Sequence, residues 1–127
     1  MARIVIIEDN PLNLKLEALV LRKAGHEVAV ATNATDGLAL IARERPDAVL
    51  MDIQMPGMDG LEATCRLRAD PANATLIILA VSACALPDDA RLARAAGCDG
   101  YMVKPVHRQD LLAALDGLLA TRGLPGS

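Results

Sequence analysis

The sequence predicts an α/β fold in which five parallel strands alternate with five helices in a doubly wound (βα)5 sheet. Five short apolar runs, several of them rich in Val and Ile, lie at Arg3–Ile7, Glu27–Ala31, Asp47–Met51, Leu76–Val81 and Tyr101–Val103. Runs that are continuous rather than alternating are typical of parallel strands covered on both faces. The segments between them carry apolar residues at helical spacing. Such alternation favours right-handed crossovers with helices on both sides of the sheet.

Residues typical of helix ends separate these segments. Asn10-Pro11 places a capping residue before a helix-starting proline, and Asn33 with Asp36 resembles a capping box. Gly25 and Gly97 stand where the first and fourth helices should end. The last helix is predicted from one broad apolar stripe, formed by Leu111, Leu112, Leu115, Leu118 and Leu119.

Length and composition indicate one globular domain. The 127 residues are 53% hydrophobic and 23% charged, which favours a sizeable core. A net charge of −3 argues against general binding to nucleic acids or anionic membranes, and 1% aromatic residues leave no base-stacking platform. We expect the domain to span residues 1–122, followed by a short flexible tail at 123–127.

Cysteine and histidine usage suggests no metal or redox centre. Cys65, Cys84 and Cys98 form no CxxC pair, which predicts buried structural thiols in a reducing compartment. His26 and His107 lack ligand companions at suitable spacing, and we expect both at the surface. No secretory signal or apolar stretch of roughly 18 to 20 residues is present. The sequence therefore predicts a cytoplasmic protein with no membrane attachment.

Charged and hydroxyl residues follow four of the five predicted strands. Glu8 and Asp9 follow the first, Asp52 the third, Ser82 the fourth and Lys104 the fifth. Ligands of open α/β sheets bind beyond the carboxyl ends of the strands. In the flavodoxin-like strand order 2-1-3-4-5, the first and third strands are neighbours. Three carboxylates should therefore converge, facing one lysine and one hydroxyl.

This combination fits phosphoryl chemistry supported by a metal ion. Clustered carboxylates repel one another, and a hard cation such as Mg²⁺, which commonly holds phosphate as well, offsets that repulsion. Asp52 could then attack phosphorus and form an acyl phosphate. Lys104 would stabilise the charge on the transferring group, and the Ser82 hydroxyl could donate to a phosphoryl oxygen.

The motifs, in this order, resemble the receiver domain of two-component response regulators. The resemblance extends from Arg3 to about Leu119. It rests on Glu8-Asp9-Asn10, on the run from Leu50 to Gly60 around Asp52, on Ser82-Ala83 and on Lys104-Pro105. Thirty residues separate Asp52 from Ser82, and fifty-two separate Asp52 from Lys104. Each residue alone has an ordinary structural explanation, such as a turn, a cap or a solvated charge, but the joint pattern is specific.

The resemblance implies a phosphoacceptor and a metal site. Asp52 is implied as the phosphoacceptor. Glu8, Asp9 and the main-chain carbonyl of Gln54 are implied as the other members of the Mg²⁺ site, with Glu8 acting through water.

The resemblance also implies how the phosphoryl group is bound and sensed. Ser82, Lys104 and the Ala83 amide are implied as phosphoryl ligands, and Tyr101 stands where the family carries its switch aromatic. The Lys104-Pro105 peptide is implied to be cis. Position 82 is a Ser rather than the commoner Thr, which predicts a less tightly coupled switch.

The resemblance implies a signalling module that catalyses only its own aspartyl phosphorylation and dephosphorylation. It would accept a phosphoryl group from a phosphohistidine of a histidine kinase or phosphotransfer protein. It would then bind a downstream protein differently through the fourth helix, fifth strand and fifth helix. No output domain fits in the chain, which predicts a stand-alone regulator that does not bind DNA. The motifs around Glu8 and Asp52 also resemble stand-alone cell-cycle regulators and receivers of hybrid kinases.

The first helix carries two apolar stripes. Leu12, Leu16 and Leu19 lie on one side, and Leu14 and Leu21 lie on the opposite side. In the resembled family, this helix commonly docks the phosphodonor. Our hypothesis is that Leu14 and Leu21 form the docking patch; the alternative is that they pack under the last helix.

Three rival functions remain open. An aspartyl-nucleophile phosphatase of the haloacid-dehalogenase kind needs a second Asp two residues after the nucleophile, where this chain has Gln54. A flavodoxin-like FMN site would be disfavoured because Glu8 and Asp9 repel a phosphate. A degenerate receiver that only binds partners is disfavoured by the intact acidic pair, Asp52 and Lys104.

Overall fold

One five-stranded parallel sheet organises the structure, a computed structural model that describes residues 2–83 and 87–123. The strands are β1 (Arg3–Ile7), β2 (Glu27–Ala31), β3 (Ala48–Asp52), β4 (Ile77–Ser82) and β5 (Gly100–Val103). Their order is β2-β1-β3-β4-β5, with every neighbouring pair parallel. The predicted fold, strand order and alternation of elements are confirmed.

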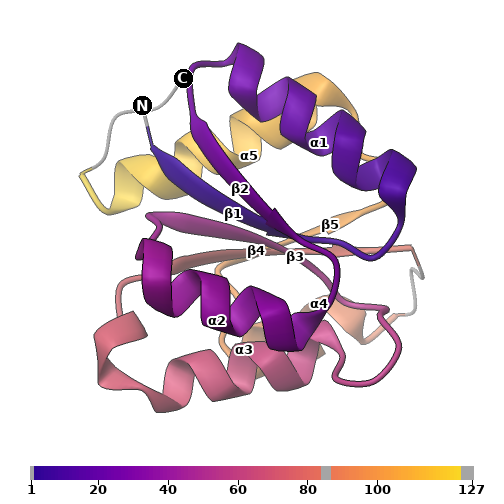
Figure 1. Ribbon diagram of the computed structural model, residues 1–127. Coiled ribbons are helices and arrows are strands. Elements are labelled where there is room, and N and C mark those ends of the chain that lie inside the picture. Colours follow the sequence, from indigo (N-terminus) through magenta and orange to yellow (C-terminus); the bar gives the residue numbers. More distant parts are fainter. Residues whose placement is uncertain (1, 84–86, 124–127) are drawn as a thin grey trace.

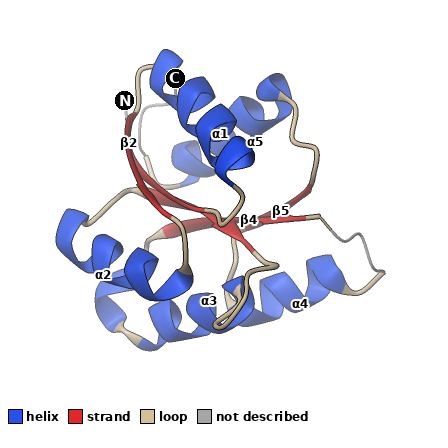
Figure 2. Cartoon of the chain, turned by 45° about the vertical axis from the view of Figure 1, so that its right-hand side comes forward, coloured by secondary structure: helices blue, strands red, loops and turns tan. Residues whose placement is uncertain are grey.

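Helices cover both faces of this sheet (Figure 1). They are α1 (Pro11–Lys23), α2 (Ala34–Glu44), α3 (Gly60–Ala69), α4 (Asp89–Ala96) and α5 (Arg108–Thr121), with a short 3-10 helix, η1 (Pro71–Asn73). Turned by 45°, the sheet is seen between α1 and α5 on one side and α2, α3 and α4 on the other (Figure 2). Within the described parts of the chain, no helix combines the length and the hydrophobicity that a membrane crossing requires.

The predicted caps set the helix ends. The Asn10 side chain accepts hydrogen bonds from the main-chain N–H groups of Leu12 and Asn13, so α1 begins at its proline. Asn33 caps α2 by accepting from the Asp36 N–H, and its side-chain amide donates back to the Asp36 carboxylate. Two hydrogen bonds thus fix the start of α2, as a capping box would.

The core consists of two layers, one on each face of the sheet. β3 and β4 are buried along their whole length, as their continuous apolar sequences predict. One layer packs β1, β3 and β4 against α2, α3 and α4. The other packs the opposite side chains of the same strands against α1 and α5, centred on Leu111, Leu115 and Leu119. Strand ends held between two packed layers are rigid supports for a functional site.

Leu14 and Leu21 of α1 face the core and not the surface, as the alternative to the docking hypothesis predicted. Leu21 is fully buried and Leu14 packs against the α1–α5 layer of the core. Leu12, Leu16 and Leu19 are instead 64%, 52% and 49% exposed. The helix is apolar on both sides, so only its packing against the sheet and α5 decides which stripe is covered.

Two further surface predictions need correction. His26 is buried, and its Nδ1 accepts a hydrogen bond from the Ala2 N–H, which ties the start of β1 to the start of β2. Cys65 is exposed rather than buried, whereas Cys98 is buried beside the Thr64 hydroxyl, and neither forms a disulfide. His107 is exposed, as predicted. Cys84 and residues 124–127 of the expected tail lie outside the described residues.

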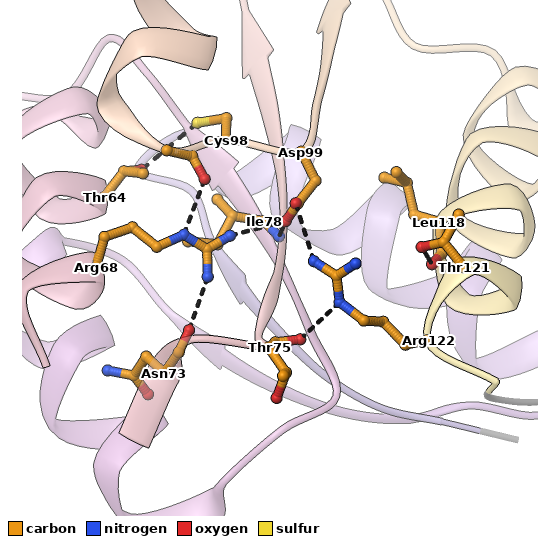
Figure 3. Close-up of polar contacts among 11 residues, drawn as sticks. Thr64, Arg68, Asn73, Thr75, Ile78, Cys98, Asp99, Leu118, Thr121 and Arg122 are labelled. Atoms are coloured by element: carbon orange, nitrogen blue, oxygen red, sulfur yellow. Dashed lines mark hydrogen bonds and ion pairs between the residues drawn. The ribbon is translucent and has the colours of Figure 1, made fainter. Parts of the chain in front are cut away.

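An ion-pair network links α3, β4, the start of β5 and the end of α5 (Figure 3). It lies at the amino ends of the strands, whereas the predicted site follows their carboxyl ends. The Asp99 carboxylate, just before β5, accepts from the Ile78 N–H and from Arg68, each at 2.8 Å, and from Arg122 at 3.2 Å. Arg68 also donates to the main-chain carbonyls of Gly97 and Asn73. These contacts fix β5 beside β4 and thereby help to position the residues that follow β5.

Candidate functional site

The three predicted carboxylates converge at one edge of the sheet. Ile7 of β1 pairs with Met51 of β3, so the residues that follow, Glu8 and Asp52, lie side by side. One carboxylate oxygen from each of Glu8, Asp9 and Asp52 lies within 4.8 Å of the other two. Glu8 and Asp52 are buried and Asp9 is exposed, so the cluster has an open side. We call Glu8, Asp9 and Asp52 the acidic cluster.

Lys104 points into this cluster, as predicted. Its ammonium nitrogen lies 2.7 Å from Glu8 Oε1 and 3.4 Å from Asp52 Oδ1. The Lys104 N–H donates to the Ser82 carbonyl, which holds the lysine beside the end of β4, and the Lys104–Pro105 peptide is cis. Burial disfavours the ammonium form, but the carboxylates of Glu8 and Asp52 outweigh it and raise the pKa of Lys104. The lysine is therefore a permanent positive charge at the site.

The pKa of Asp52 is strongly raised by its surroundings. Burial, followed by the adjacent carboxyl groups of Glu8 and Asp9, raises its pKa to about 8, and Lys104 offsets this only in part. Among the described residues, no donor makes a hydrogen bond to either buried oxygen of Asp52. Buried anionic oxygens without donors are the arrangement that a hard cation satisfies. The residues present therefore fit a divalent cation at this position.

Glu8 is held in place from two sides. Its Oε1 contacts Lys104, and its Oε2 accepts a hydrogen bond of 3.1 Å from the Asn10 N–H. The residue that caps α1 thus also orients a carboxylate of the cluster. Each oxygen of Glu8 thus has a charged or N–H group beside it.

The Gln54 side chain makes contacts that the sequence did not predict. Its Nε2 donates to Ser82 Oγ at 2.7 Å, and its Oε1 accepts from the Ala83 N–H at 2.9 Å. Sequence reasoning assigned only the main-chain carbonyl of Gln54 to the site. The side chain bridges both groups at the end of β4 that were predicted to bind a phosphoryl group.

A fourth buried carboxyl group, Glu17 of α1, was also missed. It is 7% exposed, and its Oε1 has no hydrogen-bond partner among the described residues. Burial, together with the charge of Glu8 and despite that of Lys104, raises its pKa to about 7. Glu17 stands three residues after Leu14 and four before Leu21, which places it on the same face of α1. This spacing could have indicated that Glu17 shares the surroundings of these two leucines.

Ser82 and Tyr101, the two residues predicted to form a switch, lie on neighbouring strands. Ser82 ends β4 and is fully buried, facing the loop that carries Gln54. Tyr101 of β5 is half-buried against the core layer under α3 and α4, and its neighbour across the sheet is Ala80. The hydroxyl and the ring thus belong to adjacent strands, β4 and β5.

Comparisons with known proteins agree with this geometry. Residues 4–116 match the response regulator receiver domain family. Protein PilH of Pseudomonas aeruginosa is 38% identical over 120 residues, which cover 94% of this chain and 99% of PilH. The polar-differentiation response regulator DivK of Brucella anthropi is 38% identical over 103 residues, covering 81% of this chain and 84% of DivK.

A solved structure extends the comparison to the metal. The receiver domain of a sensor histidine kinase from Pseudomonas aeruginosa PAO1 superposes with a TM-score of 0.86 at 32% identity, covering 94% of this chain and 98% of that domain. That domain has a magnesium ion coordinated in its active-site cleft.

The fold, the acidic cluster and these matches define a phosphorelay signalling module rather than an enzyme that turns over a separate substrate. The chain belongs to the response regulator receiver domain family of two-component signal transduction. Its acidic cluster is typical of the magnesium site of such domains. Membership of this family accounts for the acidic cluster, so neither a phosphatase nor an FMN-binding protein is needed to explain it.

Proposed function

We propose that this chain accepts a phosphoryl group onto Asp52 from a phosphohistidine of a histidine kinase or phosphotransfer protein in the cytoplasm, and then binds a downstream protein differently. The observation that carries the proposal is the buried Asp52 carboxyl group, which receives no hydrogen bond from the described residues, 2–83 and 87–123, and lies 3.4 Å from the Lys104 ammonium. Its oxygens are not engaged by protein donors, so one of them can act as the nucleophile once the group is ionised beside Lys104 and a bound cation.

The residues divide the chemistry among them. An Asp52 oxygen attacks phosphorus, the bond from phosphorus to the donor histidine nitrogen breaks, and the imidazole leaves with a proton from solvent. Asp9, Asp52 and the Gln54 carbonyl would hold Mg²⁺, with Glu8 acting through water, and the ion would neutralise charge on the transferring group. Lys104, which lies beside Asp52, would stabilise the same charge.

The switch would use the end of β4. Once Asp52 is phosphorylated, the Ser82 hydroxyl and the Ala83 N–H donate to phosphoryl oxygens. Movement of Ser82 toward Asp52 opens space beside β4, and Tyr101 rotates inward to fill it. The surface formed by α4, β5 and α5 then differs in shape, so a local change of charge alters partner binding without contact to DNA.

The chemistry is tested by intact mass. Incubation with acetyl phosphate or phosphoramidate and Mg²⁺ should add one phosphoryl group to the wild-type chain, and a chelator should prevent it. Asp52→Asn should abolish the gain because the amide is not a nucleophile toward phosphorus. A wild-type chain that gains no mass, or an Asp52→Asn variant that gains it equally, would contradict the proposal.

The exposed stripe of α1 is the proposed docking surface for the phosphodonor. Leu12, Leu16 and Leu19 are about half exposed or more, and α1 begins directly after the acidic cluster, so a partner seated there can place a histidine near Asp52. Buried apolar area at the centre of an interface carries much of its binding energy.

We expect Leu16→Asp to slow phosphoryl transfer from a cognate kinase by about ten-fold or more, since a charge would be buried in the interface. Phosphorylation by acetyl phosphate should be unchanged. The matched control is Leu92→Asp on α4, which is 43% exposed on the opposite side of the sheet and should leave kinase transfer intact. Equal loss with both phosphodonors would exclude docking as the role of this stripe.

A further inference from the structure

We propose that the Gln54 side chain occupies the phosphoryl-binding groups of the resting protein, so that an incoming phosphoryl group must displace it. The inference rests on the proposed function, because it concerns the groups that would bind the phosphoryl oxygens. It makes Gln54 a positioning residue, acting through Ser82 and Ala83 rather than on phosphorus.

The contacts of Gln54 imitate those of a phosphoryl group. Its Oε1 accepts from the Ala83 N–H at 2.9 Å, which is the role of a phosphoryl oxygen at the same amide. Its Nε2 engages Ser82 Oγ at 2.7 Å, which is the hydroxyl that should turn toward phosphorylated Asp52. One side chain, two residues after the phosphoacceptor, therefore holds both groups in their resting positions.

The burial of Ser82 gives a physical reason for the Gln54 contact in the resting protein. Ser82 is fully buried, so its hydroxyl needs hydrogen-bond partners in the resting protein, and Gln54 supplies one of them. Gln54 is exposed, so its amide can return to water when it is displaced. The exchange replaces hydrogen bonds between neutral groups with hydrogen bonds to a charged group, which are stronger. The phosphoryl group should therefore displace the Gln54 side chain, but it should bind with lower net affinity than if Gln54 made no contact with these groups.

Gln54→Ala should make the phosphorylated state easier to reach. With Mg²⁺ present, its affinity for beryllofluoride, a phosphoryl mimic, and its rate of phosphorylation by acetyl phosphate should rise about three- to ten-fold, the range that one exchanged hydrogen bond supports. The substitution keeps the main-chain carbonyl at position 54. The matched control is Gln109→Ala, an exposed glutamine on α5, which should behave as the wild type.

Gln54→Glu provides a second, opposite test. Its carboxylate retains the acceptor for the Ala83 N–H and makes a stronger, charge-assisted bond, while it repels the incoming phosphoryl group. Beryllofluoride affinity and the phosphorylation rate should therefore fall, by about ten-fold.

An NMR signal separates this role from a general effect on structure. The Ala83 amide resonance should differ between wild type and Gln54→Ala before phosphorylation, and should coincide after beryllofluoride binds, because the same oxygens then accept in both proteins. A Gln54→Ala variant that binds the mimic equally or more weakly would overturn the inference, as would an Ala83 resonance that the substitution leaves unchanged. If the wild type binds no mimic and gains no phosphoryl group, the proposed function itself fails.

Discussion

Asp52→Asn is expected to stabilise the metal-free protein at pH 8 by several kcal/mol, although it removes the phosphoacceptor. The folded protein raises the pKa of Asp52 from 3.8 to about 8, first by burial and then through Glu8 and Asp9. Ionising this carboxyl group in the folded state is therefore costly. An amide of the same shape avoids that cost. The carboxyl group at position 52 therefore lowers the free energy of unfolding, although phosphorylation requires it.

The sign of the pH dependence follows from the raised pKa. Between about pH 4 and pH 8, the folded state keeps the Asp52 proton while the unfolded state has lost it, so wild-type stability falls as pH rises through this window. The advantage of Asp52→Asn should thus be smaller at pH 5 than at pH 8. Urea unfolding followed by circular dichroism, with a chelator present, measures both values.

Glu17→Gln is the matched control. Glu17 has a pKa raised to about 7, chiefly by burial, so its amide variant should also be more stable at pH 8 than at pH 5 relative to wild type. Phosphorylation by acetyl phosphate should persist in this variant, whereas Asp52→Asn loses it. Added Mg²⁺ should stabilise the wild type more than Asp52→Asn. An Asp52→Asn protein less stable than wild type at pH 8 without metal would contradict this account.

The residues that the sequence predicted well are those that local patterns determine. Continuous apolar runs gave the bounds of β1 and β2 as Arg3–Ile7 and Glu27–Ala31, and Asn10 and Asn33 marked the starts of α1 and α2. Once the strand order is set, the convergence of residues after parallel strands is a geometric consequence. The acidic cluster and its contact with Lys104 could therefore be foreseen.

The residues that were missed depend on packing between distant segments. The covered stripe of α1 is decided by the sheet and α5, which is also why Glu17 is buried. His26 is buried because its ring accepts from the Ala2 N–H, a contact between segments 24 residues apart. The Gln54 bridge to Ser82 depends on a side-chain rotamer in a loop. Sequence spacing places Glu17 on the same stripe as Leu14 and Leu21, but it does not tell which stripe of α1 is covered, and it encodes neither the His26 contact nor the Gln54 rotamer.

Gly60→Ala is expected to destabilise the protein by about 2–3 kcal/mol and to impair phosphorylation. Gly60 begins α3, and its N–H donates to the Ile53 carbonyl at 3.0 Å. A Cβ there would collide with the Asp52 carbonyl oxygen and lie 2.9 Å from Ile53 Cα. These are backbone atoms that cannot rotate away, so α3 would have to move from the end of β3 and take the phosphoacceptor out of position.

Gly117→Ala separates this clash from a general effect of replacing glycine. Gly117 lies within α5, where an added Cβ meets no atom within 4 Å, so the variant should gain about 0.5–1 kcal/mol from the better helix propensity of alanine. Thermal and urea unfolding of both variants, with acetyl phosphate labelling at a temperature where each is folded, gives the comparison. If Gly60→Ala is as stable as wild type and is phosphorylated at the same rate, close approach of α3 to β3 does not position Asp52.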